Sequence, residues 1–329
     1  MSGSPLAMPA EWMPHERVFI GFPHIFDEWG EPLAPAQVEI ADFATAIADN
    51  GKGEAVHLVC NDDASAALAR ELAGPAVDVL VERIGDAWLR DTAAIIVGGG
   101  KARIGRDFGF NWWGGKYEIP GDEDVGARLA ERFGFPVETC DWILEGGSID
   151  VDGAGLCVTT EQCLLARNRN AGITKEQAEA WLRRDLGIER VLWLGDGLLN
   201  DHTDGHVDNL ARFVSAGKLA LPVAEGNDDP NAAIYADARA RTEASGVEVI
   251  AIPSPGLTLR EGEIVPASYM NFYIGNSVVA VPTYGMPNDD RAVAAIAALF
   301  PDRRTVGLRA DAILSGGGSF HCISQQIPL

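Results

Sequence analysis

Short strand-like runs alternate with helix-like stretches from one end of this 329-residue chain to the other. The first example is an apolar run at residues 56–60, followed by a helical stretch at 64–72 and a second apolar run at 77–81. Short runs rich in Val and Ile predict buried strands, and strands that alternate with helices predict α/β units. We therefore expect an α/β fold.

The same order recurs further along the chain. Thr174 stands three residues before Gln177 and opens a helical stretch, which is a capping-box sequence. The other expected elements are strands at 93–97, 191–194 and 247–252 and helices at about 231–244 and 289–300. Units of similar size that follow one another suggest internal architectural repetition.

No Pro- or Ser-rich linker, charge block or low-complexity tract divides the chain. Domain boundaries usually fall in such linkers, so residues 1–329 are expected to form a single domain. A chain of this length can also bury a sizeable core.

The charge balance limits the partners of the protein. Its 48 acidic and 26 basic residues give a formal net charge of −22, which repels phosphate backbones and anionic lipids and attracts cations. Nucleic acid is not expected as a partner, although the surplus carboxylates could simply serve solubility. No apolar run approaches the roughly 20 residues of a membrane helix, and the first residues lack signal-peptide features. We expect a cytoplasmic protein without membrane contact.

Five cysteines at irregular spacing predict neither a disulfide framework nor a zinc pattern. Four of them stand in or beside apolar stretches and are expected to be inert buried thiols: Cys60, Cys140, Cys157 and Cys163. Cys322 differs, because it follows His321 and the three consecutive glycines at 316–318. Glycines allow close approach of the backbone to a ligand. Cys322 is thus a candidate nucleophile, and the alternative is a half-buried thiol on a flexible turn.

A polar segment at residues 201–209 leads into an apolar run. If the chain is extended here, His206 and Asp208 project on the same side. A metal site built on His202, His206 and the aspartates is an alternative, which is weakened by the scattered positions of the other histidines. His202 and Asp204 could also simply cap a strand.

Two acidic residues stand in segments that also contain apolar residues or glycines: Asp91 in the segment 87–92 and Glu145 in the segment 144–148. A buried carboxylate is costly unless it meets a cation or a hydrogen-bond network. Asp91 is therefore expected either to pair internally, perhaps with Arg90, or to bind a positively charged ligand.

These segments together resemble the agmatine deiminase family, which belongs to the guanidine-modifying enzymes that also include arginine and peptidyl-arginine deiminases. The resemblance covers nearly the whole chain and lies in the motifs at residues 9–12, 110–115, 144–148, 159–165, 267–273 and 316–326. It implies a pseudo-fivefold α/β propeller, the pentein fold, built from five ββαβ units with the active site at the centre.

The resemblance also implies roles for individual residues. Cys322 matches the nucleophile, His206 the general acid and base, and Glu145 the carboxylate paired with that histidine; Asp91 and Asp208 match the pair that holds the guanidinium. Two carboxylates suit a planar, forked cation. The expected reaction is hydrolysis of agmatine to N-carbamoylputrescine and ammonia through a covalent thiouronium on the cysteine, with no cofactor and no metal required.

The chain departs from the family pattern near the expected substrate tail. Ala93-Ala94 stands where the family usually has Gly-Pro, and Lys116 follows the 110–115 motif. Trp88 and Trp113 could form apolar walls for a methylene chain, with Asn271 nearby, but core packing is an equally good interpretation of each tryptophan.

Other functions remain alternatives at this level. A peptidyl-arginine deiminase, another guanidine hydrolase or an amidinotransferase would share the same residues. A non-catalytic polyamine binder is disfavoured, because binding alone needs neither a nucleophile nor a proton shuttle. In each case the expected partner is a small cationic guanidine, and homo-oligomerisation stays open.

Overall fold

The computed structural model describes residues 6–226 and 228–329, and within them the strands form five sheets of three or four strands and one two-stranded hairpin. The larger sheets, in spatial order, are β18 (Ser324–Pro328), β1 (His15–Phe22), β2 (Ala55–Cys60) and β3 (Asp78–Val81); β4 (Ile95–Val97), β5 (Ile104–Gly109) and β6 (Val137–Ile143); β7 (Ile149–Val151), β8 (Leu156–Thr160) and β9 (Arg190–Leu194); β10 (Arg212–Ser215), β11 (Lys218–Val223) and β12 (Glu248–Pro253); and β15 (Tyr273–Ile274), β16 (Val278–Thr283) and β17 (Arg304–Arg309). The hairpin pairs β13 (Leu259–Arg260) with β14 (Glu263–Ile264).

All five larger sheets repeat one pattern. The first strand in each spatial order pairs antiparallel with the second, and the second pairs parallel with the third. Parallel neighbours need a crossover connection, usually a helix. The crossover helices are α2 (Leu33–Ala48), α6 (Val125–Phe133), α8 (Lys175–Leu186), α9 (Ala232–Ala244) and α10 (Asp289–Ala297), and α3 (Asp63–Ala73) joins β2 to β3. The repeated order of elements predicted from the sequence is therefore present.

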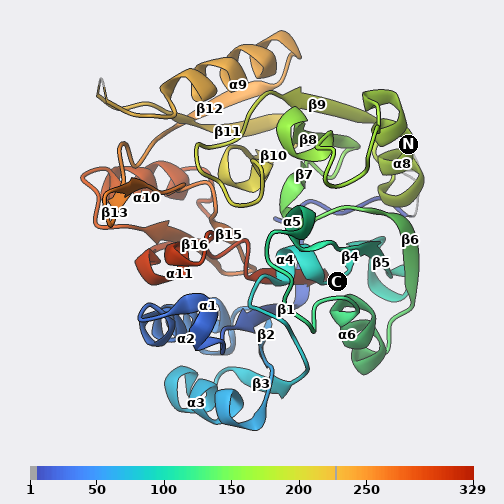
Figure 1. The fold of residues 1–329 in the computed structure, drawn as a ribbon, viewed down its shortest axis with the longest axis vertical. Helices are drawn as coiled ribbons and strands as arrows, with labels where there is room; N and C mark the ends of the chain where they lie inside the picture. Colours follow the sequence, from blue (N-terminus) through green and yellow to red (C-terminus); the bar gives the residue numbers. More distant parts are fainter. Residues whose placement is uncertain (1–5, 227) are drawn as a thin grey trace.

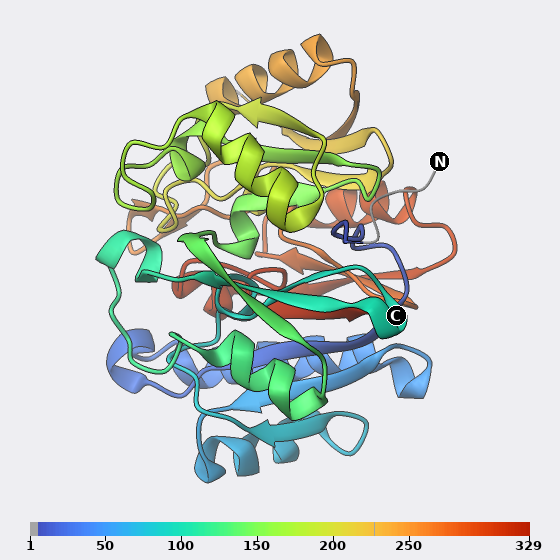
Figure 2. The ribbon, with the colours of Figure 1, turned by 90° about the vertical axis from the view of Figure 1, so that its right-hand side faces the viewer.

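The C-terminal strand completes the N-terminal sheet. β18 lies antiparallel to β1, with Gln326 opposite Val18, and Figure 2 shows this red strand beside the blue N-terminal elements. Because Cys322 precedes β18 by only two residues, this pairing carries the cysteine next to the first unit of the chain.

Short helices connect the units. They are α1 (Phe26–Trp29), α4 (Leu89–Thr92), α5 (Trp112–Gly115), α7 (Glu161–Leu164) and α11 (Asp311–Ser315), together with the 3-10 turns η1 (Asp49–Gly51), η2 (Gly100–Ala102), η3 (Gly146–Ser148) and η4 (Val207–Asn209). Figure 1 shows α4 near the middle of the molecule and the longer helices α3, α6, α8 and α9 toward the periphery. The short helix α4, which contains Asp91, therefore lies near the middle of the molecule.

The capping box and the strand predicted from short stretches of sequence are present in the structure. Thr174 and Gln177 form the predicted capping box at the start of α8, and the run at 56–60 lies within β2, whose last five residues are buried. In the described part of the chain, no helix is both long and apolar enough to cross a membrane.

Candidate active site

A cavity of about 130 Å³ opens beside the central connecting segments. Its lining includes the rings of Trp88, Trp113 and Tyr117, the carboxylate-bearing Asp91 and Glu28, and the thiol-bearing Cys322 with the glycines at 316–318. The cavity therefore brings together the expected nucleophile, one expected guanidinium-binding acid and both expected aromatic walls.

Cys322 is held by Asn271 on two sides. The Asn271 side chain donates to the Cys322 Sγ at 3.0 Å, and its oxygen accepts from the backbone N–H of Cys322 at 3.2 Å. The sulfur also lies 3.4 Å from Oδ2 of Asp208. Asn271 thus orients the thiol and contacts it directly, whereas the sequence suggested a contact with the substrate. The glycine at 318 makes room, because a Cβ there would lie 2.6 Å from the Trp88 ring.

Burial raises the pKa of the Cys322 thiol well above its usual value, and the negative charges of Asp208 and Asp91 raise it further. The thiol is therefore protonated in the empty site. A cation placed between these carboxylates offsets both effects, since it supplies the positive charge that a thiolate requires.

Three polar groups converge on Gly147 in η3. A Cβ at this position would lie 2.5 Å from Nδ1 of His206, 3.0 Å from Oδ1 of Asp91 and 3.1 Å from Oδ2 of Asp208. Only a residue without a side chain allows this approach. Position 147 therefore requires glycine for a steric reason that the sequence alone does not reveal.

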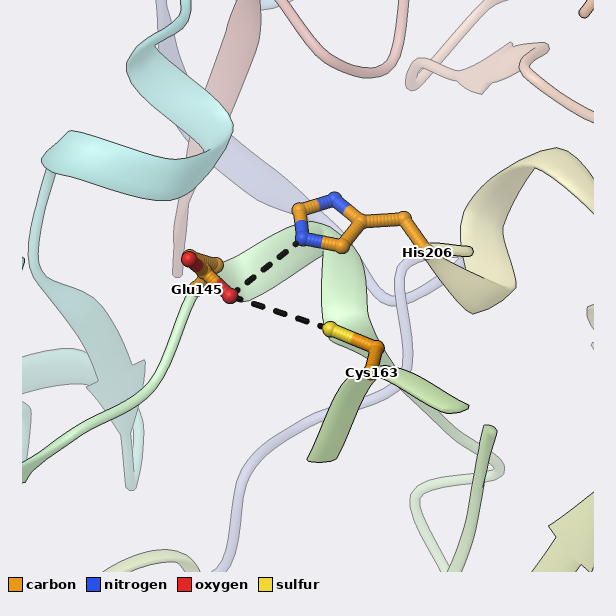
Figure 3. Close-up of side chains that lie close together, drawn as sticks. All are labelled: Glu145, Cys163 and His206. Atoms are coloured by element: carbon orange, nitrogen blue, oxygen red, sulfur yellow. Dashed lines mark hydrogen bonds and ion pairs between the residues drawn. The ribbon is translucent and has the colours of Figure 1, made fainter. Parts of the chain in front are cut away.

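His206 is fully buried between two carboxylates. Its Nε2 lies 3.5 Å from Oε2 of Glu145, as Figure 3 shows, and its Nδ1 lies 3.7 Å from Oδ2 of Asp91. Burial by itself lowers the pKa of His206, but Asp91, then Cys163 and then the hydrogen bond to Glu145 outweigh it and raise the pKa well above its usual value. Among the described residues, His206 Nδ1 and Asp208 Oδ1 have no hydrogen-bond partner. Both orphaned atoms are available to a ligand.

The segment around His206 is not extended, contrary to the expectation from sequence. Residues Val207–Asn209 form the 3-10 turn η4, because the N–H groups of Leu210 and Ala211 both bond back to the carbonyl of Val207. The turn, rather than the alternation of a strand, carries His206 and Asp208 to the same glycine.

Asp91 does not pair with Arg90. It accepts hydrogen bonds from Nε1 of Trp113 and from the N–H of Gly147, both at 2.9 Å. Arg90 instead lies 3.7 Å from Glu11. Burial raises the pKa of Asp91, although the charge of the nearby imidazole opposes this. The imidazole of His206 is therefore the cation that faces Asp91 in the structure.

Glu145 has a second partner that sequence reasoning missed. Nε of Arg169 donates to Oε1 of Glu145 at 2.8 Å. Burial raises the pKa of Glu145, but His206 and Arg169 outweigh it and lower the pKa below its usual value. The polar Asn-Arg-Asn stretch at 168–170 was the available signal for this arginine.

Residues His202 and Asp204 neither cap a strand nor gather at a metal site. His202 lines the cavity, and Asp204 pairs with Lys116 at 2.5 Å and with Arg169 at 2.5 Å. Lys116, one of the departures from the family pattern, thus ties the segment after α5 to the rim of the cavity.

Two further residues border the site. Trp88 forms part of the cavity wall but is also core: its ring stacks on Trp29 at 5.6 Å, and its Nε1 donates to Asp86 at 2.9 Å. Cys163 is buried as predicted, but its sulfur lies 3.8 Å from Oε2 of Glu145 and so belongs to the polar site. The spacing of Cys163 from Glu145 in the chain gave no sign of this contact.

The chain is similar to known proteins over nearly its whole length. The family model described as Porphyromonas-type peptidyl-arginine deiminase matches residues 7–328. An agmatine deiminase from Stutzerimonas stutzeri (strain A1501) is 38% identical over 358 residues, covering 98% of this chain and 95% of the relative. The structure of an Enterococcus faecalis agmatine deiminase aligns with a TM-score of 0.90 at 32% identity, covering 98% of this chain and 96% of that one.

A C. jejuni agmatine deiminase solved with substrate bound has the same fold, with a TM-score of 0.90 at 27% identity and coverage of 98% and 96%. The mixed α/β fold and the family resemblance predicted from the motifs are thus confirmed. The chain belongs to the Porphyromonas-type peptidyl-arginine deiminase family, among relatives that are agmatine deiminases.

Proposed function

We propose that this protein is a hydrolase of linear amidines that converts agmatine and water into N-carbamoylputrescine and ammonia. One observation carries the proposal: an imidazole with a raised pKa and two carboxylates converge around Gly147, and one of these carboxylates contacts the thiol of Cys322, which lines the cavity. The agmatine deiminases among the relatives support the choice of substrate.

In this proposal the guanidinium lies between Asp91 and Asp208. Oδ1 of Asp208 has no hydrogen-bond partner among the described residues, and each carboxylate oxygen offers two acceptor directions. Hydrogen bonding from His321 lowers the pKa of Asp208 despite its burial, so this carboxylate is ionised and ready for a cation. Two carboxylates also fix the plane of the guanidinium and expose its carbon to Cys322.

The reaction then follows from the proton positions. Binding of the cation favours ionisation of Cys322, whose proton passes to water, and the thiolate sulfur then adds to the guanidinium carbon. His206, protonated in the empty site, gives its Nδ1 proton to the departing amine, which leaves as ammonia. The resulting neutral imidazole takes a proton from water, whose oxygen adds to the thiouronium carbon, and the C–S bond breaks to release the urea product. Glu145 keeps the imidazole oriented throughout.

Agmatine carries a second cation at the far end of a short alkyl chain. We assign the methylene chain to the space between Trp88, Trp113 and Tyr117, and the distal ammonium to Glu28, the other carboxylate-bearing residue that lines the cavity with Asp91. A carboxylate at this position attracts an amine and repels the α-carboxylate of free arginine. This charge arrangement favours agmatine over free arginine.

A substrate panel tests the proposal. Ammonia release should be fastest with agmatine, slower with an arginine peptide and slowest with free arginine, and Glu28→Gln should raise KM for agmatine more than it lowers kcat. A faster rate with the peptide would instead assign a peptidyl-arginine deiminase. Mass spectrometry after rapid quenching with agmatine should find an amidine adduct on the peptide that contains Cys322; an adduct elsewhere would contradict the mechanism.

The repeated sheet pattern supports a finer proposal about architecture. The five sheets with one strand order, and the pairing of β18 with β1 that joins the two ends of the chain, fit a single domain with five units around a pseudo-fivefold axis. A crystal structure in which the five units superpose by successive rotations of about one fifth of a turn would establish this propeller.

A further inference from the structure

Behind His206, on the side away from Asp91, lies a trio of metal-binding side chains. Glu145, Cys163 and His206 each offer one ligand atom, and these three atoms lie within 4.8 Å of one another. Glu145 and Cys163 are 1% exposed and His206 is 0% exposed. Figure 3 shows one carboxylate oxygen of Glu145 facing both the imidazole and the sulfur.

The spacing of the three atoms suits zinc. Zn²⁺ is held tetrahedrally at about 2.3 Å from sulfur and about 2.0–2.2 Å from nitrogen or oxygen, so neighbouring ligand atoms stand about 3.3–3.6 Å apart. Oε2 of Glu145 lies 3.5 Å from Nε2 of His206 and 3.8 Å from Sγ of Cys163. These two distances are within a few tenths of an ångström of those between neighbouring ligands of zinc, and the third pair, Nε2 of His206 and Sγ of Cys163, lies within 4.8 Å, so closing the site requires the thiol and the imidazole to approach each other.

The nearest cation does not occupy the ligand atoms. Arg169 donates one hydrogen bond to the other carboxylate oxygen of Glu145, Oε1, and another to the carboxylate of Asp204. Oε2 stays free to coordinate while Oε1 keeps its arginine. The ligand set of one thiolate, one imidazole and one carboxylate matches the mixed sulfur, nitrogen and oxygen preference of Zn²⁺.

We propose that Glu145, Cys163 and His206 form an inhibitory zinc site in which the metal displaces the proton shared between the imidazole and the carboxylate. Coordination releases two protons, one from Nε2 of His206 and one from Sγ of Cys163, and a water molecule takes the fourth position. The inhibitory part of the inference rests on the proposed function, because it depends on His206 as the proton shuttle. An imidazole bound to zinc through Nε2 no longer has its hydrogen bond to Glu145 and no longer cycles between its protonated and neutral forms.

Metal binding is tested first by a readout independent of activity. Co²⁺ added to the purified protein should produce a thiolate-to-cobalt charge-transfer band, and Zn²⁺ should abolish it by replacement. Cys163→Ala should lose the band and weaken Zn²⁺ binding, measured by calorimetry, by about 100-fold or more, since even groups that only support metal ligands contribute 10–100-fold. Cys157→Ala is the matched control, because Cys157 is a buried cysteine on the neighbouring β8 whose thiol faces the carbonyl of Val158.

Cys322→Ser separates this site from the catalytic thiol and covers the case in which Cys163→Ala does not fold. The cobalt band should persist in Cys322→Ser; its loss there, or its persistence in a folded Cys163→Ala protein, would overturn the inference. Agmatine hydrolysis by the wild type should fall in parallel with Zn²⁺ occupancy and recover with a chelator, while a folded Cys163→Ala variant should keep its own metal-free rate at the same Zn²⁺ concentration. A protein that binds Zn²⁺ through Cys163 but has no agmatine activity would contradict the proposed function and leave the metal site standing.

Discussion

Two buried histidines stand between carboxylates at the centre of this protein, but their contacts differ. His321 lies 2.8 Å from Asp208 through Nδ1 and 2.8 Å from Glu11 through Nε2. His206 lies 3.7 Å from Asp91 and 3.5 Å from Glu145, distances that are long for hydrogen bonds. We call the first group (His321, Asp208, Glu11) the tight cluster and the second group (His206, Asp91, Glu145) the loose cluster.

A buried arginine holds the tight cluster in place. Glu11 also pairs with Arg212 at 2.8 Å, and Arg212 is fully buried. Arginines and carboxylates that alternate in this way compensate one another, and loss of one member leaves a buried charge without its partner. The tight cluster therefore has the character of structural support for Asp208.

The loose cluster borders the cavity through Asp91 and keeps an orphaned nitrogen on His206. The imidazole of His321 has a short hydrogen bond at each ring nitrogen, so its protons move with difficulty. The imidazole of His206 has only long contacts, so it can exchange a proton with a ligand. The comparison thus assigns proton transfer to the loose cluster and rigidity to the tight cluster. The two meet at Cys322, because its sulfur contacts Asp208 of the tight cluster and the charge of Asp91 of the loose cluster acts on its thiol.

The largest effect is expected where the clusters meet. Cys322→Ser should lower turnover of agmatine by about 10⁴-fold or more, because the hydroxyl is a far weaker nucleophile than the thiolate. Substrate binding, measured by calorimetry, should remain. The control is Cys60→Ala, at a buried cysteine in β2, which should keep the turnover of the wild type. Substantial activity in Cys322→Ser would mean that Cys322 is not the nucleophile.

Next in size is the loss of the loose cluster's histidine. His206→Gln should lower kcat by about 10²–10⁴-fold, the usual contribution of general acid–base catalysis. The far-UV circular dichroism spectrum should be unchanged. Single-turnover kinetics should show no ammonia burst, and a normal burst would place the proton transfer elsewhere.

The tight cluster should respond in stability rather than in turnover. Glu11→Gln should lower the free energy of unfolding by about 3–5 kcal/mol, because Arg212 and His321 lose a buried partner. Denaturant titration measures this change. The exposed pair of Glu248 with Lys218 is the control, since Glu248→Gln should cost less than about 1 kcal/mol. Equal losses in the two variants would mean that the tight cluster contributes no special stability.

Gly147→Ala tests whether the loose cluster tolerates crowding. The added methyl would lie 2.5 Å from Nδ1 of His206, so we expect a rate loss of about 10²-fold from misplacement and a stability loss of about 1–3 kcal/mol from overpacking. Gly217→Ala, where a Cβ meets nothing within 4 Å, should leave kcat unchanged despite its positive φ. A fully active Gly147→Ala enzyme would show that the convergence is not required.

The smallest effect concerns pH. The pKa of His206 is raised in the folded protein, so its protonated form stabilises the fold below the unfolded pKa of about 6.5, and this stability is lost as the pH rises through the folded pKa. The stability advantage of the wild type over His206→Gln, worth about 1.4 kcal/mol for each pKa unit, should therefore shrink from pH 6 to alkaline pH. Denaturant titrations at several pH values measure this difference in the free energy of unfolding. A difference that grows as the pH rises would mean that the pKa of His206 is lowered, not raised, by folding.

The sequence was most informative where structure is local. The capping box at Thr174, the strand at 56–60 and the helix near 231–244 all depend on residues within a few positions of one another, and each is present in the structure. The motifs also indicate Cys322 and Glu145 from the sequence alone, and the family they indicate is the family that the comparisons show.

The partners of these residues were decided by the tertiary structure. Arg90, one of the two partners that the sequence left open for Asp91, pairs with Glu11 instead; His206 precedes a 3-10 turn and not an extended segment; and Cys163, buried as expected, lies beside Glu145. Glu145 and His206 are separated by 61 positions, and Glu11 and His321 by 310. No local propensity acts over such separations.

By itself, then, the amino-acid sequence determined the order of strands and helices, the glycines and the chemical groups available for a reaction on a guanidinium. Only the tertiary structure decided which carboxylate faces which imidazole, and at what distance. The physical reason is that a secondary-structure preference depends on neighbouring residues, while the energy of a buried charge depends on every group that packing brings around it.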